Sequence, residues 1–490
     1  MQFFEIVLII VSTSYVGFNR FINNKLDKKY ILGLLVFTIA LQLIINGFRL
    51  QMIPAYLIWL IAIIAALRQS GHKPRIIVRA LKTIGILVIL ALSIILPSIL
   101  PVFELPEPRG SYKVGTELIH VKTDRDEIIT KDPSDNRELL YKIWYPSEAD
   151  VSSLQGEKYV DQGSRIGFAR MYGIPPALLN HLDLVKTYVY TDIPVADGRF
   201  PVLIFSHGYG SQATGYYAIL MELASQGYVI INMNHTYESL GGTFPDGRIT
   251  SFDFDYAREI SKESMKVDES LEKAFEEGRD FEDRHTIIKN VMKNYHKAEL
   301  QVRWAEDMIF TIDLLEKWNA KGLLKDKIDF DKIGVFGHSA GGGTSANIAI
   351  MDSRVKAAAN LDGNPWGNLI DTTLNIPFLH VSADRPAEYW DINSHIYINK
   401  STDCFYESKL LNSGHANFMD IPFMIPVRSL TGTGDIDPYL GMEIVTKLLT
   451  SFFDKHLKKE PDSDPQKIGE EYELLEMTVY QGDSLSSVSN

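Results

Sequence analysis

Four long apolar runs occupy the first hundred residues and constrain the fold more than any other feature of the chain. They span residues 3–17, 30–48, 52–67 and 83–103 and contain almost no charged side chains. A helix needs about twenty apolar residues to cross a bilayer; the second and fourth runs reach this length, and the other two are near the lower limit. We therefore expect about four transmembrane helices within residues 1–104, with buried core helices as the alternative.

The basic residues between these runs are unevenly distributed, which predicts the orientation of the helices. The loops after the first and third runs are rich in lysine and arginine, whereas the short second loop carries only Arg49. The basic residues are Arg20, Lys25, Lys28 and Lys29 in the first loop and Arg68, Lys73, Arg75, Arg79 and Lys82 in the third. By the positive-inside rule these two loops are cytoplasmic. We therefore expect a multi-pass protein of the cell membrane whose larger part lies on the extracytoplasmic side.

The rest of the chain is strongly acidic. The sequence holds 49 Lys+Arg and 62 Asp+Glu, of which residues 1–104 hold 10 and 3, so 39 basic and 59 acidic residues follow and give a net charge of −20. Nucleic acid is bound through basic surfaces, so we expect no nucleic-acid partner. Cys404 is the single cysteine. An outward-facing domain without disulfides is more typical of a bacterial surface protein than of an animal secreted one.

From about Gly110 onward, short β-rich runs alternate with helical stretches. This alternation is typical of an α/β domain with a mostly parallel sheet flanked by helices. The β-rich runs that matter most for the chemistry are 202–206, 228–233, 333–336, 357–361 and 378–381. We expect one α/β domain over residues 110–460 and a polar, loosely ordered tail over residues 461–490.

A long charged segment, residues 252–318, interrupts this alternation and is rich in Lys, Glu and Ala. We expect a helical insertion and a helix that packs on the sheet through side chains such as Trp304 and Met308. The segment is expected to be largely solvated. A role in covering the active site is the alternative.

The sequence Gly337-x-Ser339-x-Gly341 has the spacing of a nucleophile elbow. It directly follows the β-rich run 333–336 and opens a stretch, residues 342–350, that can be helical. The serine of such an elbow sits in a sharp, strained turn, so its neighbours must be small. We therefore predict an α/β-hydrolase fold with Ser339 as the nucleophile.

A serine hydroxyl needs a histidine to remove its proton and a carboxylate to orient that histidine. In this fold the chain order is serine, acid, histidine. The histidines after Ser339 are His380, His395, His415 and His456. His415 lies in a loop after an apparent strand near the end of the domain. The others lie in an apparent strand, a polar stretch and a terminal helix, so we predict His415 as the base.

Two aspartates are in position to orient this histidine. Asp362 follows the run 357–361, and Asp384 follows the run 378–381. Either position can face the histidine in an α/β hydrolase, and placement after the later strand is the commoner one, which favours Asp384. The residues alone leave this choice open.

The oxyanion hole needs backbone N–H groups directed at the developing negative charge. One is expected from Ala340, directly after the serine, and one from Tyr209, in the loop after the run 202–206. No His-x-x-x-His pair, cysteine pair or calcium-loop spacing occurs, so neither a metal nor another cofactor is expected.

Five motifs resemble, in order and spacing, those of the plasma and type II platelet-activating factor acetylhydrolases. They are Phe-Ser-His-Gly-Tyr-Gly at 205–210, Gly-His-Ser-Ala-Gly-Gly at 337–342, Ala-Asn-Leu-Asp at 359–362, His-Ala-Asn-Phe-Met-Asp at 415–420 and Gly-Asp-Ile-Asp at 434–437. The resemblance implies a lipase-like, calcium-independent α/β hydrolase that cleaves short or oxidised acyl groups from phospholipids. It also implies Asp362 as the acid, whereas resemblance to bacterial cutinases would imply Asp384.

The function expected from these features is that of a membrane-anchored serine ester hydrolase acting on lipid-like or short-acyl esters. A cutinase-like polyesterase is a second reading. A membrane sensor or assembly protein without activity is a third, from another class. The largely apolar stretch 166–182, which contains two adjacent prolines, is expected to form part of the acyl pocket or a membrane-facing lip.

Overall fold

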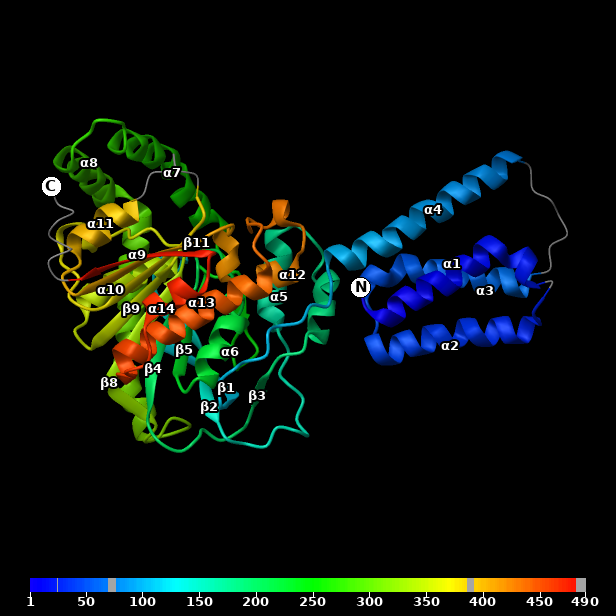
Figure 1. Ribbon diagram of the computed structural model, residues 1–490, viewed down its shortest axis with the longest axis horizontal. Helices are drawn as coiled ribbons and strands as arrows, with labels where there is room; N and C mark the ends of the chain where they lie inside the picture. The colour runs from blue at the N-terminus through cyan, green and yellow to red at the C-terminus, as the bar shows by residue number, and fades with distance from the viewer. Residues whose placement is uncertain (24, 69–75, 386–391, 482–490) are drawn as a thin grey trace. The chain divides into compact units, whose positions relative to one another are not determined.

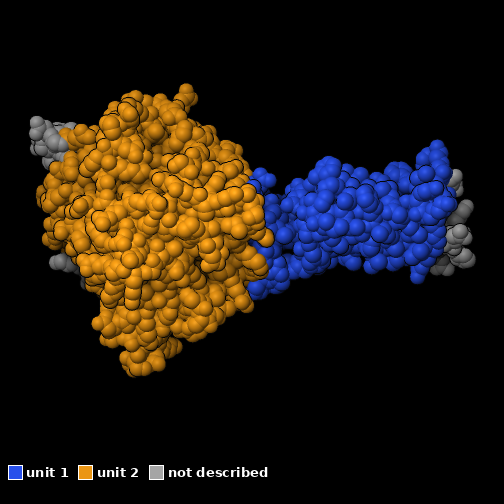
Figure 2. Space-filling view, turned by 90° about the horizontal axis from the view of Figure 1, so that it is seen from below, with its two compact units in different colours: residues 1–104, 173–186, 423–427 blue, residues 105–172, 187–422, 428–490 orange. Residues whose placement is uncertain are grey.

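The computed structural model describes residues 1–23, 25–68, 76–385 and 392–481 of the chain. These residues form two compact units, drawn in separate colours in Figure 2. Unit 1 consists of Met1–Glu104, Gly173–Lys186 and Phe423–Val427, and unit 2 of Leu105–Tyr172, Thr187–Pro422 and Arg428–Asn490. Two segments that the sequence places in the α/β domain thus belong to unit 1. Lys73, Arg75 and residues 482–490 lie outside the described ranges.

Unit 1 is built from the apolar helices of the amino-terminal region (Figure 1). The helices are α1 (Phe3–Asn23), α2 (Lys28–Asn46), α3 (Ile53–Leu67) and α4 (Ile76–Ile99). Within the described part of the chain, three helical segments are long and apolar enough to cross a membrane: Lys28–Asn46, Leu50–Leu67 and Ile76–Ile99. The first predicted span is helical, but its apolar part, Phe3–Asn19, is shorter. The helix kinks at Phe18, where the backbone leaves helical geometry.

A buried ion pair holds one end of unit 1 together. Arg49, between α2 and α3, donates to Glu5 Oε1 over 2.7 Å and to the carbonyl of Leu100 over 2.5 Å, and neither charged side chain is exposed. The start of α1, the second loop and the exit of α4 therefore lie at one end of the unit. At this same end, Gln51 Nε2 donates to the carbonyl of Leu178, in the 3-10 helix η2 (Pro176–Leu184), over 2.6 Å.

Unit 2 contains a ten-stranded sheet within the described residues, with the order β12-β11-β10-β9-β8-β4-β5-β2-β1-β3. The strands are β1 (Lys113–Asp126), β2 (Asn136–Ser147), β3 (Val189–Thr191), β4 (Phe200–Ser206), β5 (Val229–His235), β8 (Ile328–His338), β9 (Val355–Leu361), β10 (Phe378–Ala383), β11 (Cys404–Leu410) and β12 (Leu475–Gln481). From β11 to β5 all neighbours are parallel. Strands β4 and β5 are buried along their whole length, as expected for parallel strands covered on both faces. The predicted α/β-hydrolase fold is confirmed.

Helices cover both faces of this sheet (Figure 1). The helices of unit 2 include α5 (Gln162–Met171), α6 (Tyr217–Ser225), α7 (Phe254–Ala274), α8 (Phe281–Asn294), α9 (His296–Ala320), α10 (Ala340–Met351), α11 (Ile392–Lys400), α13 (Pro438–Phe453) and α14 (Pro465–Glu471). Helices α9 and α10 pack against each other, as do α6 and α13. The long segment 252–318 corresponds to α7, α8 and α9, and α9 buries Trp304 and Met308 as expected.

The carboxyl-terminal tail differs from the expectation of loose order. Residues Pro465–Glu471 form α14, and Leu475–Gln481 form β12, which pairs antiparallel with β11 from Leu410↔Leu475 to Cys404↔Gln481. Only Leu475 is fully buried along this edge strand. The sequence of β12 alternates the apolar residues Leu475, Met477 and Val479 with polar residues, and its backbone completes the sheet.

Candidate active site

The predicted catalytic residues gather at the carboxyl ends of the parallel strands, where ligand sites of α/β sheets form. Ser339 follows β8, Asp362 follows β9, His415 follows β11 and Tyr209 follows β4. Together with Ala340 they line one cavity of about 360 Å³. Asp384, after β10, is exposed and is not among the residues that line this cavity.

Ser339 occupies the strained turn expected of a nucleophile elbow. Its backbone has φ +57° and ψ −120°, in the left-handed half of φ space that side-chain-bearing residues rarely adopt. A Cβ at Gly337 would lie 2.3 Å from the backbone of Gly341, and a Cβ at Gly341 would lie 2.1 Å from the carbonyl oxygen of Ser206. Both glycines are therefore required by close backbone contact, and the turn presents a partly exposed Ser339 to the cavity.

Asp362 holds His415 directly. His415 Nδ1 donates to Asp362 Oδ2 over 2.6 Å, and the same carboxylate accepts from the Ala383 N–H over 2.9 Å and from Arg385 over 2.7 Å. Burial alone would raise the pKa of Asp362, but the hydrogen bond from His415 and the charge of Arg385 outweigh it and hold the pKa below its usual range. The carboxylate therefore stays ionised and leaves His415 Nε2 as the ring nitrogen not engaged by the acid.

Asp384 has a different role. Its Oδ2 accepts the Asn412 N–H over 2.9 Å, and its own N–H donates to the carbonyl of Ser413. These bonds connect the loops after β10 and β11. The structure thus brings Asp362, and not Asp384, to the histidine.

A hydrogen-bonded link joins the three loops that carry the predicted residues Ser339, His415 and Tyr209, and the sequence motifs gave no sign of it. His338 Nε2 lies 3.0 Å from the carbonyl oxygen of His415, which can only accept, so this nitrogen carries the proton and Nδ1 accepts from Tyr216 Oη over 2.9 Å. The Tyr216 hydroxyl in turn accepts the N–H of Gly208 over 3.2 Å. Gly208 lies in the loop after β4 that carries Tyr209, and we call this loop the oxyanion loop. Burial lowers the pKa of His338 to about 3, so the ring stays neutral in this arrangement.

The polar residues of the motif 415–420 that follow His415 form hydrogen bonds that hold neighbouring loops together. Asn417 Oδ1 accepts the N–H groups of Gly414 and Gly434 over 2.8 and 2.7 Å. Asp420 accepts the first N–H groups of α6, from Tyr217 and Ala218, over 2.7 and 3.1 Å, and the Tyr159 hydroxyl over 2.9 Å. These bonds tie the histidine loop to the helix that follows the oxyanion loop.

The oxyanion loop is shaped by a neutral, buried histidine. His207 Nδ1 donates to the Gly208 carbonyl over 2.7 Å, and Nε2 accepts the His235 N–H over 3.2 Å. Burial lowers the pKa of His207 to about 3. Within the described ranges, neither the N–H of Tyr209 nor that of Ala340, the first residue of α10, donates to another group of the chain. Both predicted donors thus remain available to a ligand oxygen.

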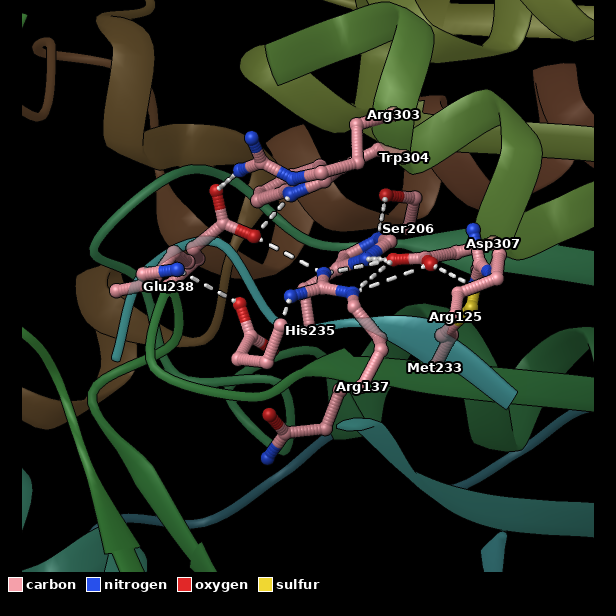
Figure 3. A network of polar contacts seen from close by, with 12 residues as sticks. Arg125, Arg137, Ser206, Met233, His235, Glu238, Arg303, Trp304 and Asp307 are labelled. Carbon is pink, nitrogen blue, oxygen red and sulfur yellow. Dashed lines mark hydrogen bonds and ion pairs between the residues drawn. The ribbon is translucent and has the colours of Figure 1, made fainter. Parts of the chain in front are cut away.

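Behind this loop lies a buried ionic network centred on Arg137 (Figure 3). Arg137 donates to Glu127, Glu238 and Asp307 over 3.1, 3.0 and 2.7 Å. Asp307 Oδ2 lies 2.8 Å from His235 Nδ1, and His235 Nε2 lies 2.9 Å from Ser206 Oγ.

Ser206, His235 and Asp307 thus repeat the order of a catalytic triad, but all three are fully buried. Substrate cannot reach Ser206, which directly precedes His207. The network therefore holds Ser206, the residue at the start of the oxyanion loop, in place. The indole ring of Trp304 stacks on the imidazole ring of His235 with 3.8 Å between the ring centroids and so supports the network.

The helical insertion reaches the cavity. Ile260 of α7 and Leu300 of α9 line it. They also pack with Trp304 against Tyr209 and Ala340. The insertion thus forms an apolar wall of the site. No group of three or more His, Cys, Asp or Glu side chains suited to a metal ion occurs among the described residues.

The sheet order and the serine elbow define the class of the protein: it is an α/β hydrolase. The family model of platelet-activating factor acetylhydrolase, isoform II, matches residues 100–472. The platelet-activating factor acetylhydrolase of Canis lupus familiaris is 26% identical over 389 residues, which are 74% of this chain and 79% of the dog protein. A probable 1-alkyl-2-acetylglycerophosphocholine esterase of Arthroderma benhamiae is 23% identical over 388 residues, 69% of this chain and 82% of its own.

Among solved structures, the ferulic acid esterase of Streptomyces cinnamoneus superimposes with a TM-score of 0.58 and 24% identity, covering 77% of this chain and 100% of that one. This likeness supports the fold. The chain belongs to the isoform II family of platelet-activating factor acetylhydrolases and is a carboxylic ester hydrolase. The family resemblance seen in the motifs is confirmed.

Tyr216→Phe tests the hydrogen-bonded link that joins the three loops. The substitution keeps the ring but leaves His338 Nδ1 and the Gly208 N–H without their partner, so the oxyanion loop loses a support. We expect kcat to fall about tenfold with a KM change below about threefold, since a buried unpaired polar group costs about 1–3 kcal/mol. Steady-state ester hydrolysis gives both constants. Tyr472→Phe is the control, because it removes a hydroxyl bonded to Lys447 and Glu443 away from the cavity. An unchanged kcat in Tyr216→Phe would contradict the link.

Asp420 predicts a pH dependence of stability. Burial raises its pKa from 3.8 to about 6. The folded state therefore holds this proton more tightly than the unfolded state, and stability falls as the pH rises from about 4 to about 6. At about 1.4 kcal/mol per pH unit for one proton, the loss is about 3 kcal/mol. Asp420→Asn removes the titrating carboxyl group and with it this loss of stability. The free energy of unfolding of the variant minus that of wild type should therefore increase by about 3 kcal/mol between pH 4 and pH 7.5.

Urea unfolding of the full-length protein in detergent measures this difference. Asp435→Asn is the control for removing one carboxylate, because the side chain of Asp435 is exposed. Parallel pH profiles of Asp420→Asn and wild type would contradict the assignment.

Proposed function

We propose that the protein is a membrane-anchored serine esterase that cleaves short-acyl or lipid-like esters through an acyl-enzyme. The observation that carries the proposal is the 2.6 Å contact of His415 with Asp362 in the cavity that also holds Ser339. The substrate class follows from the relatives, which are named acetylhydrolases and an acetylglycerophosphocholine esterase. The cavity of about 360 Å³ is at the small end of ligand pockets, roughly 300–1,000 Å³, which favours a short acyl group.

In the proposed reaction, His415 takes the proton of the Ser339 hydroxyl as its oxygen attacks the ester carbonyl. The carbonyl oxygen becomes an oxyanion that the N–H groups of Tyr209 and Ala340 stabilise, each by about 3 kcal/mol. The tetrahedral intermediate collapses, the C–O bond to the alcohol breaks, and His415 returns the proton to the leaving alcohol. Water then repeats these steps on the acyl-enzyme and releases the acid. Asp362 holds His415 in the required tautomer throughout.

The site residues are tested by Ser339→Ala, Asp362→Asn and Asp384→Asn. We expect Ser339→Ala to abolish turnover, and Asp362→Asn to lower kcat by about four orders of magnitude because the histidine loses its tautomer. Asp384→Asn is the matched control, since it removes a carboxylate that bonds only to the neighbouring loop, and its kcat should stay within about threefold of wild type. Hydrolysis of p-nitrophenyl acetate and of an acetylated phospholipid gives the rates.

Loss of turnover in Asp384→Asn alone would instead favour the cutinase-like reading. Absence of fluorophosphonate labelling in wild type, or its persistence in Ser339→Ala, would favour the inactive sensor or assembly protein.

We further propose that the helices of residues 1–104 anchor the protein in the cell membrane with the catalytic unit on the extracytoplasmic side. The apolar length of the helices and the basic first and third loops support this orientation. In a Cys404→Ser background, Lys131→Cys places a thiol on the exposed surface of unit 2, and Lys25→Cys places one in the first loop. We expect a membrane-impermeant maleimide to label Lys131→Cys in intact cells and Lys25→Cys only after permeabilisation. The reverse pattern would contradict the orientation.

A further inference from the structure

The catalytic cavity is basic, although the part of the chain that forms it is acidic. Residues after 104 carry 39 basic and 59 acidic side chains. Nevertheless, Lys297 and Arg385 both line the cavity, and Asp362 is the one carboxylate among its described lining residues. The local charge is thus opposite in sign to that of the surrounding domain.

Lys297 contributes a charge that has no anionic partner in the described structure. It lies in the first turn of α9 and is partly buried. Its ammonium group lies 5.4 Å from the ring centroid of Tyr295, and no described carboxylate pairs with it. An ammonium group that is partly removed from water gains most from a charged hydrogen-bond acceptor.

Arg385 brings a second charge that is held in place. One guanidinium nitrogen donates to Asp362 Oδ2 over 2.7 Å, so the group is fixed beside the acid that holds His415. A guanidinium carries five donors in a rigid plane, which suits it to phosphate and carboxylate groups. The cavity also has an apolar wall, formed by Ile260 and Leu300.

We propose that Lys297 and Arg385 form an anion subsite that binds a phosphate or carboxylate group of the ester substrate while the apolar wall receives its hydrocarbon part. This inference rests on the proposed esterase function and narrows its substrate class to anionic esters. The anion can be attached on either side of the ester bond. On the alcohol side it would be a headgroup phosphate, and on the acyl side a terminal carboxylate.

Two pairs of esters distinguish these sources in assays of the full-length protein in detergent. The alcohol-side pair is a 1-alkyl-2-acetylglycerol phosphate and the corresponding 1-alkyl-2-acetylglycerol. The acyl-side pair is mono-p-nitrophenyl glutarate and p-nitrophenyl valerate. The readout is the ratio of kcat/KM for the anionic ester to kcat/KM for the neutral ester in each pair. We expect wild type to prefer the anionic member of one pair, and that pair identifies the position of the anion.

Lys297→Gln should lower the ratio of that pair about tenfold, as expected for losing one charge-assisted hydrogen bond, and Lys297→Arg should largely retain it. Raising the ionic strength should lower the same ratio in wild type. Lys317→Gln is the matched control: it removes the same charge from an exposed position on the same helix, about 30 Å further along α9. Its ratios should equal those of wild type.

Ratios unaffected by Lys297→Gln in both pairs, with both neutral esters hydrolysed, would overturn the anion subsite and leave the esterase function standing. If wild type hydrolysed no member of either pair, or if Ser339→Ala retained full activity, the proposed function would fail and the subsite with it.

Discussion

The hydrogen bond of 2.6 Å between His415 and Asp362 joins two loops whose residues are 53 positions apart in the chain. It can form because β9, β10 and β11 are adjacent and parallel, so the loops that follow them open at the same edge of the sheet. Asp362 is buried, and a buried carboxylate that loses its partners is strongly destabilising. Its further bonds to the Ala383 N–H and to Arg385 keep it satisfied and ionised. The geometry of the site thus depends on the order of the strands and on this shared carboxylate.

The parts of the site that sequence reasoning could predict are those that local rules determine. Gly337 and Gly341 are required by backbone contacts of the elbow, so the spacing around Ser339 has a local cause. Likewise, a position directly after a buried β-rich run places a polar residue at the carboxyl edge of the sheet. The residues alone could not decide between Asp362 and Asp384, because both satisfy this rule and only the paths of the loops separate them.

Other features depend on contacts between distant parts of the chain, and no local pattern predicts them. Tyr216 meets His338 across 122 positions, and Arg137 meets Asp307 across 170. The sequence of the insertion, residues 252–318, is that of a charged helical segment. Two of its apolar side chains, Ile260 and Leu300, nevertheless line the cavity. Edge strand β12, in contrast, does carry a local signal, because Leu475, Met477 and Val479 alternate with polar residues; it was expected to be part of a loosely ordered polar tail, and it pairs with β11.

The chain returns twice to unit 1 after leaving it, at Gly173–Lys186 and again at Phe423–Val427. Gln51, near the start of α3, bonds to Leu178 and contacts His181, both within the first returning segment. The first returning segment is therefore bonded to the amino-terminal helical region. A truncated protein that begins at residue 105 would retain the returning segments but lose the helices against which the first of them packs. The side chain of Leu184, which lies close to Gly47, would lose this contact, and a soluble catalytic fragment would need redesign of the first returning segment.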